Sequence, residues 1–181
     1  DLNNRKTLLH IFLLSVFFTF LGLEVVYAIG SVKLYETLGL SKFAYGIVWG
    51  FLPSMMSLIV SKHAGIFVKK YGALKVFRVS QILYVLLAVI YSIGPDMLIP
   101  LTWPIPIYPF FSVSMNVIVS RGSHRKLRGS AMGALNSSIA LAIGFSSIGG
   151  YLGDLLGRDT IMLLSTIPLM IGLLTTLAVS E

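Results

Sequence analysis

Residues 69–96 read KKYGALKVFRVSQILYVLLAVIYSIGPD and contain a pattern that recurs along the whole chain. Basic residues crowd the start, an apolar run follows over 74–93, and Gly-Pro-Asp then reverses the chain. An apolar run of this length crosses a hydrocarbon core of about 30 Å as one helix of about 20 residues. The stretch therefore predicts a transmembrane helix with a basic turn at one end and a tight turn without Lys or Arg at the other.

Five further apolar stretches flank this one. The chain is therefore predicted to be an all-α polytopic membrane protein with six transmembrane helices in a single domain, 1–181. Hydrophobic residues make up 56% of the sequence and charged residues 12%, which lies outside the usual range of soluble domains. The turns are short, so no extramembrane domain is expected. The predicted spans are 7–30, 43–66, 74–93, 97–119, 130–152 and 160–179.

The 14 Lys and Arg residues are sorted onto alternate turns. Inserted membrane proteins keep excess Lys and Arg on the cytoplasmic side of short loops, so both termini are predicted to be cytoplasmic. The net charge of +7 is then a signal of topology, and no nucleic-acid partner is expected. The sparse side holds only Lys33, Lys42 and Arg158. The crowded side holds Arg5, Lys6, Lys62, Lys69, Lys70, Lys75, Arg78, Arg121, Arg125, Lys126 and Arg128.

The chain lacks the residue sets of the common enzymes. It contains no cysteine, so disulfides and Cys-type zinc sites are excluded. Nucleophile elbows, His-Glu-x-x-His and phosphate-binding loops are also absent, so we predict no enzyme, no metal and no cofactor. The sequence begins with Asp1 and no signal peptide precedes the first span, which indicates a fragment, a processed product or part of a longer polypeptide.

The outer half of the fourth predicted span is rich in proline, which removes a helical hydrogen bond. Broken backbone at membrane depth is tolerated where protein or a water-filled cavity satisfies the freed groups. The segment 101–111 is therefore either a cavity-lining or gating segment, or a kinked helix start with Trp103 and Tyr108 in the interfacial aromatic belt. The prolines are Pro100, Pro104, Pro106 and Pro109.

Glu24 is the only acid well inside a predicted span, and an intramembrane acid is a functional hypothesis by default. It lies about 27 Å along the helix from Lys6, in the outer part of the span. Facing inward, it would bind a proton that accompanies substrate, or hold a cationic substrate. The alternative is an interfacial acid that reaches water or pairs with Lys33. Helical spacing places five residues of this span on one helical face, and these are His10, Phe17, Phe20, Glu24 and Tyr27.

Other spans carry weaker candidates for substrate contact. Asn116 in the fourth span and Asn136 in the fifth have amides that hydrogen-bond either a substrate or another helix. Tyr45 and Trp49, four residues apart, would stack on a ligand or serve packing and belt roles. Pro168 and the absence of charge make the sixth span look peripheral and lipid-facing.

Glycines at four-residue spacing predict close helix packing, because they leave one helical face nearly bare. This pattern occurs in the second predicted span, and again at the end of the fifth. The residues are Gly46, Gly50, Gly149, Gly153 and Gly157.

Two segments resemble the major facilitator superfamily of transporters. LRGSAMG at 127–133, continuing to IGGYLGDLLG at 148–157, resembles the tenth-to-eleventh loop and eleventh helix of that family. GIFVKKYGALK at 65–75 resembles its cytoplasmic loop motif, with Lys69 where the family usually has Asp. The basic residues here are alternatively anchors for anionic lipid. The matching loop positions are Gly65, Lys69, Lys70, Gly72 and Lys75.

The resemblance implies that the chain is one half, helices seven to twelve, built from two inverted three-helix repeats. Substrate lies between the halves in this family, so the other half belongs to the same polypeptide, to a separate chain or to a second copy. The implied function is secondary active transport of a small solute by alternating access, with the proton as the first candidate for a coupled ion. Membrane lipids are further partners, in the plasma membrane. The alternative is an accessory or assembly subunit that retains the half fold without transport.

Overall fold

The computed structural model describes residues 2–179, in which every regular element is a helix. The ends of the predicted domain, Asp1 and 180–181, and the side chains of Arg5 and Lys6 lie outside the described part. The elements in order are α1 (Leu2–Thr37), α2 (Lys42–Gly46), the π-helical turn η1 (Ile47–Phe51), α3 (Leu52–Tyr71), α4 (Ala73–Ile93), α5 (Leu98–Thr102), α6 (Ile107–Gly122), the 3-10 turn η2 (Arg125–Leu127), α7 (Arg128–Leu156), α8 (Arg158–Leu164) and α9 (Thr166–Leu177).

Five segments of the described chain are long and apolar enough to cross a membrane, not the predicted six. The missing one is the fourth, 97–119, which is divided into the short α5 and the 16-residue α6. Pro104 and Pro106 lie between them, and proline has no N–H with which to continue the helical ladder. The five segments are Thr7–Thr37, Lys42–Tyr71, Ala73–Ile93, Arg125–Leu156 and Arg158–Leu177.

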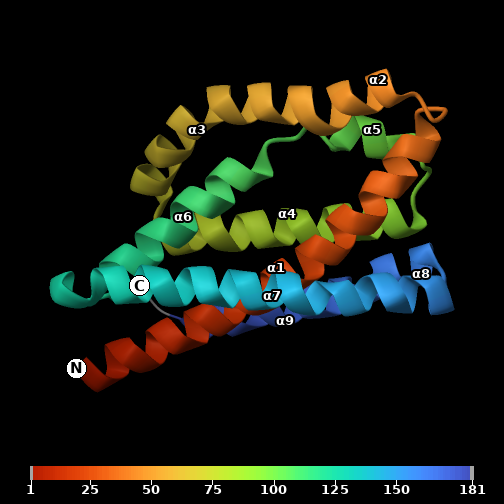
Figure 1. Cartoon of the computed structure of the whole chain (residues 1–181). Helices are drawn as coiled ribbons and strands as arrows, with labels where there is room; N and C mark the ends of the chain where they lie inside the picture. Colours follow the sequence, from red (N-terminus) through yellow and green to blue (C-terminus); the bar gives the residue numbers. More distant parts are fainter. Residues whose placement is uncertain (1, 180–181) are drawn as a thin grey trace.

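Successive long helices run in opposite directions, so the turns alternate between two ends of the bundle. In Figure 1 the start of α1, the α3–α4 and α6–α7 turns and the end of α9 lie at the left end. The α1–α2, α4–α5 and α7–α8 connections lie at the right end. The turns that the charge pattern separated are therefore separated in space. That the basic end faces the cytoplasm stays a prediction.

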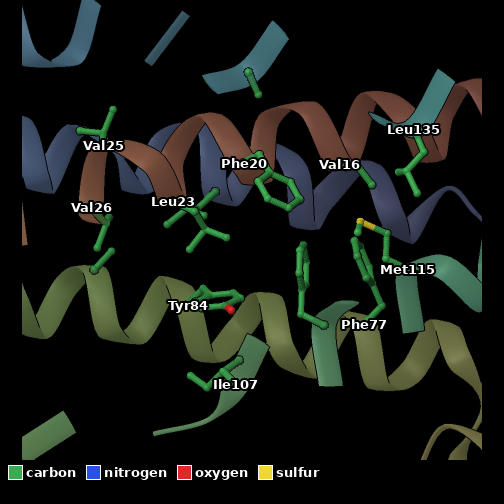
Figure 2. Packing of buried hydrophobic residues seen from close by; sticks show 14 of the residues in the cluster. Val16, Phe20, Leu23, Val25, Val26, Phe77, Tyr84, Ile107, Met115 and Leu135 are labelled. Carbon is green, nitrogen blue, oxygen red and sulfur yellow. The ribbon is translucent and has the colours of Figure 1, made fainter. Parts of the chain in front are cut away.

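The core is built on α1 and α4. Helix α1 packs mainly against α9 and α7, and α4 packs mainly against α6 and α9. Figure 2 shows Phe20 of α1 on one side of this core and Phe77 and Tyr84 of α4 on the other. The Phe111 ring of α6 stacks on Phe77, with centroids 4.7 Å apart, and lies 5.7 Å from Phe20.

The prediction that the sixth span is peripheral and lipid-facing was wrong for one face of α9. Leu169, Gly172 and Thr176 are buried against α1 and α4, while Ile167, Leu174 and Leu177 on the other face are exposed. The prediction relied on the absence of charge. Small and hydroxylated residues are also uncharged, and they pack between helices in a membrane.

A buried polar network joins α1, α4 and α9. The Gln81 amide nitrogen of α4 donates to Thr19 Oγ1 at 2.8 Å and to Ser15 Oγ at 3.2 Å, both on α1. The Gln81 carbonyl oxygen accepts from Thr176 of α9 at 3.3 Å, and Ser15 donates to the Gly172 carbonyl at 2.6 Å. Every polar group of the Gln81 side chain is thus engaged, so its burial is compensated.

We predict that Gly172→Ala destabilises the protein. A Cβ at this position would lie 2.4 Å from Thr19 Oγ1 and 3.0 Å from the Ser15 carbonyl oxygen, so α1 and α9 would have to separate. Overpacking of this kind costs about 1–3 kcal/mol. The thermal midpoint in detergent, followed by size-exclusion chromatography, should fall by several degrees.

Gly133→Ala on α7 is the matched control, because no described atom lies within 4 Å of its added Cβ. It should leave the midpoint unchanged or raise it slightly, since alanine favours helix. Equal midpoints for the two variants would contradict the close α1–α9 approach.

Candidate functional site

A cavity of about 410 Å³ lies among α1, the η1–α3 segment, α4 and the break between α5 and α6. Among the described residues that line it, Glu24 is the only charged side chain. Five of the eight substrate or ion candidates named from the sequence meet here. Glu24 and Tyr27 come from α1, Trp49 from η1, and Trp103 and Tyr108 from the α5–α6 break and the start of α6.

The α5–α6 break supplies one wall of this cavity. The main chain leaves the helix at 103–106, and the cavity is lined there by Trp103, Ile105 and Pro106, followed by Ile107 and Tyr108. The Trp103 N–H still bonds the Ile99 carbonyl oxygen, so its ring is held by the end of α5. The segment 101–111 therefore lines a cavity, while its gating role and the aromatic-belt role of Trp103 and Tyr108 stay predictions.

The lining of the cavity contains a second irregularity, the π-helical turn η1. The Leu52 N–H bonds the carbonyl oxygen of Ile47, five residues back, where an α-helix would use the residue four back. Pro53 follows and cannot donate to the carbonyl oxygen of Trp49. π-helical turns inside α-helices are frequent at functional sites. Here the turn and the proline bring Trp49 and Pro53 to the cavity.

Aromatic rings from four elements form a continuous row beside the cavity. Trp49 and Trp103 stack with centroids 4.7 Å apart, and Tyr45 stacks on Trp49 at 5.7 Å. Tyr91 stacks on Trp103 at 5.9 Å, and Tyr27 meets Trp103 edge-on at 5.7 Å. Trp103 also lies against Gly30 of α1, where an added Cβ would be 2.9 Å from its ring. The row connects η1 to α1 and α4 across the break.

Glu24 is half-buried and makes no hydrogen bond or ion pair with any described residue. Lys33, offered from the sequence as its partner, is engaged elsewhere. Its ammonium nitrogen lies 2.8 Å from Asp159 Oδ1 and 3.1 Å from Asp96 Oδ1, and it donates to the Tyr91 carbonyl oxygen at 2.9 Å. The carboxylate of Glu24 is therefore left facing the cavity without a counter-charge.

The aromatic wall predicted on one face of α1 is divided among several neighbours. Phe20 is buried in the core beside Phe111, away from the cavity lining. Phe17 meets Phe145 of α7 at 6.1 Å. Tyr27 and Glu24 alone of the predicted face line the cavity. The helix is surrounded on several sides, so one helical stripe meets several environments.

The two amide candidates do not reach the cavity. Asn116 on α6 is partly buried and Asn136 on α7 is exposed, and neither lines the cavity of Glu24. Their substrate and helix-pairing roles both stay predictions.

The loop at 65–75, which resembles the cytoplasmic loop motif, lies at the opposite end of the bundle from the Lys33 ion pairs. Gly72 takes a φ of +89° between α3 and α4, a conformation that favours glycine. Lys69, Lys70 and Lys75 are exposed, and the Lys70 ammonium lies over the Tyr71 ring. Gly65 is exposed with no described atom near an added Cβ. These positions suit a turn with solvated basic residues.

The glycines predicted for helix packing behave in two ways. Gly149 of α7 approaches Val25 of α1 so closely that an added Cβ would lie 2.5 Å from it, and Gly153 lies against Ile29. Gly157 takes a φ of +88° in the α7–α8 turn. Gly46 and Gly50 have no described atom within 4 Å of an added Cβ, so the face they bare has no described partner.

Sequence reasoning missed Tyr84 and Tyr91 of α4, both of which line the cavity. Tyr84 is almost fully buried, and its hydroxyl interacts with the hydroxyl of Tyr27. Tyr84, Tyr27 and Tyr108 lie close enough together to influence one another electrostatically. The available signal was the seven-residue spacing of the two tyrosines, two helical turns, which puts them on one face.

Comparisons with known proteins give no relative. No protein-family model matches the chain, and neither a curated protein nor a solved structure matches it. The cavity and the sequence pattern are therefore the basis of the functional proposal.

We predict that Trp49 and Trp103 give a coupled signal in circular dichroism, because their indole rings stack at 4.7 Å. The sequence contains two tryptophans, so the pair accounts for all its indoles. Trp49→Phe and Trp103→Phe should each abolish the exciton couplet, and the double variant should remove no more.

Tyr108→Phe is the control, because it leaves both indoles in place, and it should retain the couplet. Two single variants that each lose half of an additive signal would contradict the stacked arrangement.

Proposed function

We propose that this chain is a six-helix half of a secondary active transporter of the major facilitator type, which moves a small solute by alternating access. The observation that carries the proposal is a cavity with one uncompensated carboxylate, lined by broken backbone between long apolar helices. Transporters place substrate sites where discontinuous helices leave backbone free to face a cavity. The divided segment α5–α6 would serve as the sixth crossing.

The resemblance of 65–75 and 127–157 to that family supports the same proposal, as does the alternation of the turns between two ends. Two inverted three-helix repeats would then be α1 to α4 and α5 to α9. The basic end, with both termini, would face the cytoplasm of a cell whose plasma membrane holds the protein. Exposed Lys69, Lys70 and Lys75 would lie near lipid headgroups there.

Glu24 is the candidate carrier of a coupled proton. It is the acid among the residues lining the cavity, and no described basic residue pairs with it. A carboxyl group in such a position loses its negative charge when it binds a proton. The cavity is therefore negatively charged in one state and neutral in the other. Whether the exchange is symport or antiport depends on whether the proton accompanies or replaces the solute.

A partner half would cover faces that this chain leaves open. The most apolar windows of the second and fourth candidate spans, Lys42–Tyr71 and Arg125–Leu156, are almost entirely unburied. A preceding half in the same polypeptide, a separate chain or a second copy would each fit. Intact mass from the native membrane separates them, because about twice this chain's mass means a joined half.

The same open faces suit the second candidate function, an accessory or assembly subunit that retains the fold without transport. A mass matching this chain alone, with an unlike protein co-purifying under every condition and no solute uptake, would favour that function over transport.

We predict that Glu24→Gln abolishes proton-driven uptake while folding is retained. Proteoliposomes containing the natural full-length polypeptide would be given a proton gradient, inward in one set and outward in another, and a mixture of small organic solutes, with uptake read by mass spectrometry. The wild type should accumulate at least one solute above its equilibrium level. Glu24→Gln should lose that accumulation, because glutamine cannot bind and release a proton.

Glu36→Gln is the matched control, since Glu36 is an exposed acid that pairs with Arg158 at 2.7 Å. It should leave accumulation unchanged. Accumulation that persists in Glu24→Gln would overturn the coupling role of Glu24, and no uptake of any solute by the wild type would overturn the transport proposal.

A further inference from the structure

We propose that the cavity beside Glu24 binds a small organic amine in its protonated form. The Glu24 carboxylate supplies the counter-charge, tyrosine hydroxyls accept further N–H groups, and the aromatic row holds the apolar part. The inference rests on the proposed function, because it names the class of solute that the same cavity takes.

The charges around the cavity favour a cationic ligand. Neither Lys nor Arg is among the described residues that line the cavity, and Glu24 has no described ion-pair partner. The nearest basic residue along α1, Lys33, is held by Asp96 and Asp159. An ionised carboxylate in apolar surroundings is costly unless it is paired. A cationic ligand supplies the missing partner, whereas an anion would meet a like charge.

Tyrosine hydroxyls at the cavity supply hydrogen-bond acceptors. Tyr84 is 4% exposed, and its hydroxyl, which is closed to solvent, interacts with the hydroxyl of Tyr27. Tyr27 and Tyr108 line the same cavity. Phenol oxygens accept N–H bonds, so they suit an ammonium that still carries hydrogens.

The aromatic row supplies an apolar wall. Trp49 and Trp103 each stack on two described rings, so the pair forms an apolar wall. Tyr27 and Tyr108 line the cavity, and the face of a phenol ring attracts a cation. A volume of about 410 Å³ lies within the usual range of small-molecule sites. The site therefore fits an amine with a short apolar or aromatic body.

Equilibrium binding on the natural full-length polypeptide in detergent tests the inference without any transport step. The probes share one shape and differ in charge: radiolabelled 2-phenylethylammonium, neutral 2-phenylethanol and anionic 3-phenylpropanoate. The ammonium probe should bind saturably, the alcohol about ten- to hundredfold more weakly, and the anion not at all, because a hydrogen bond to a charged group is lost. Equal affinity for ammonium and alcohol would overturn the inference.

Variants assign the site. Glu24→Gln should weaken ammonium binding about ten- to hundredfold, and Glu36→Gln should leave it unchanged. Tyr108→Phe should weaken it severalfold, because it deletes a hydroxyl from a side chain that lines the cavity. Unchanged binding in Glu24→Gln would overturn the inference. The comparison of probes on the wild type decides it even if a variant does not fold.

The two proposals fail separately. Selective ammonium binding without uptake into proteoliposomes would support this inference and overturn transport. Uptake of solutes with no selective ammonium binding would support transport and overturn this inference.

Discussion

The hydrogen bonds of Gln81 decide how the three central helices meet. In hydrocarbon, apolar side chains gain little by facing each other instead of lipid, so polar contacts and close packing must select the partners. Gln81 bonds Ser15 and Thr19 on one side and Thr176 on the other, and the missing side chain of Gly172 lets α9 approach α1. This junction fixes the rotation of α1 about its own axis.

The rotation of α1 determines the environment of Glu24. At 3.6 residues per turn, Glu24 lies roughly 140° around the helix from Thr19. With Thr19 held toward α4 and α9, Glu24 is directed away from that junction and faces the cavity beside η1 and α3. A rotation of α1 by about 140° would be needed to turn Glu24 toward the polar junction in place of Thr19. The structural network and the candidate site are thus two faces of one helix.

Local sequence features predicted much of this arrangement. The helix over 74–93 was placed within a residue of α4, because Gly72 and Gly94 enclose a largely apolar run. The prolines at 104 and 106 identified the broken segment, although their effect on the count of long helices was underestimated. The contact of Trp49 with Trp103 was not predictable, because it depends on the packing of α2–η1 beside α5. Tyr84 was overlooked because a tyrosine in an apolar run is indistinguishable from a packing residue.

The ion pairs of Lys33 join the helix ends that lie at the right end of Figure 1. Lys33 is 11% exposed, but its partners Asp96 and Asp159 are 63% and 70% exposed, so solvent screens the attraction. Exposed pairs of this kind are worth about 0–1 kcal/mol each, which holds the α1, α4–α5 and α8 ends together only weakly. The pairs therefore do more by occupying Lys33 than by stabilising the bundle. Lys33 lies about 14 Å from Glu24 along α1 and on the other side of the helix, so the position of Lys33, as well as its ion pairs, leaves Glu24 without an internal counter-charge.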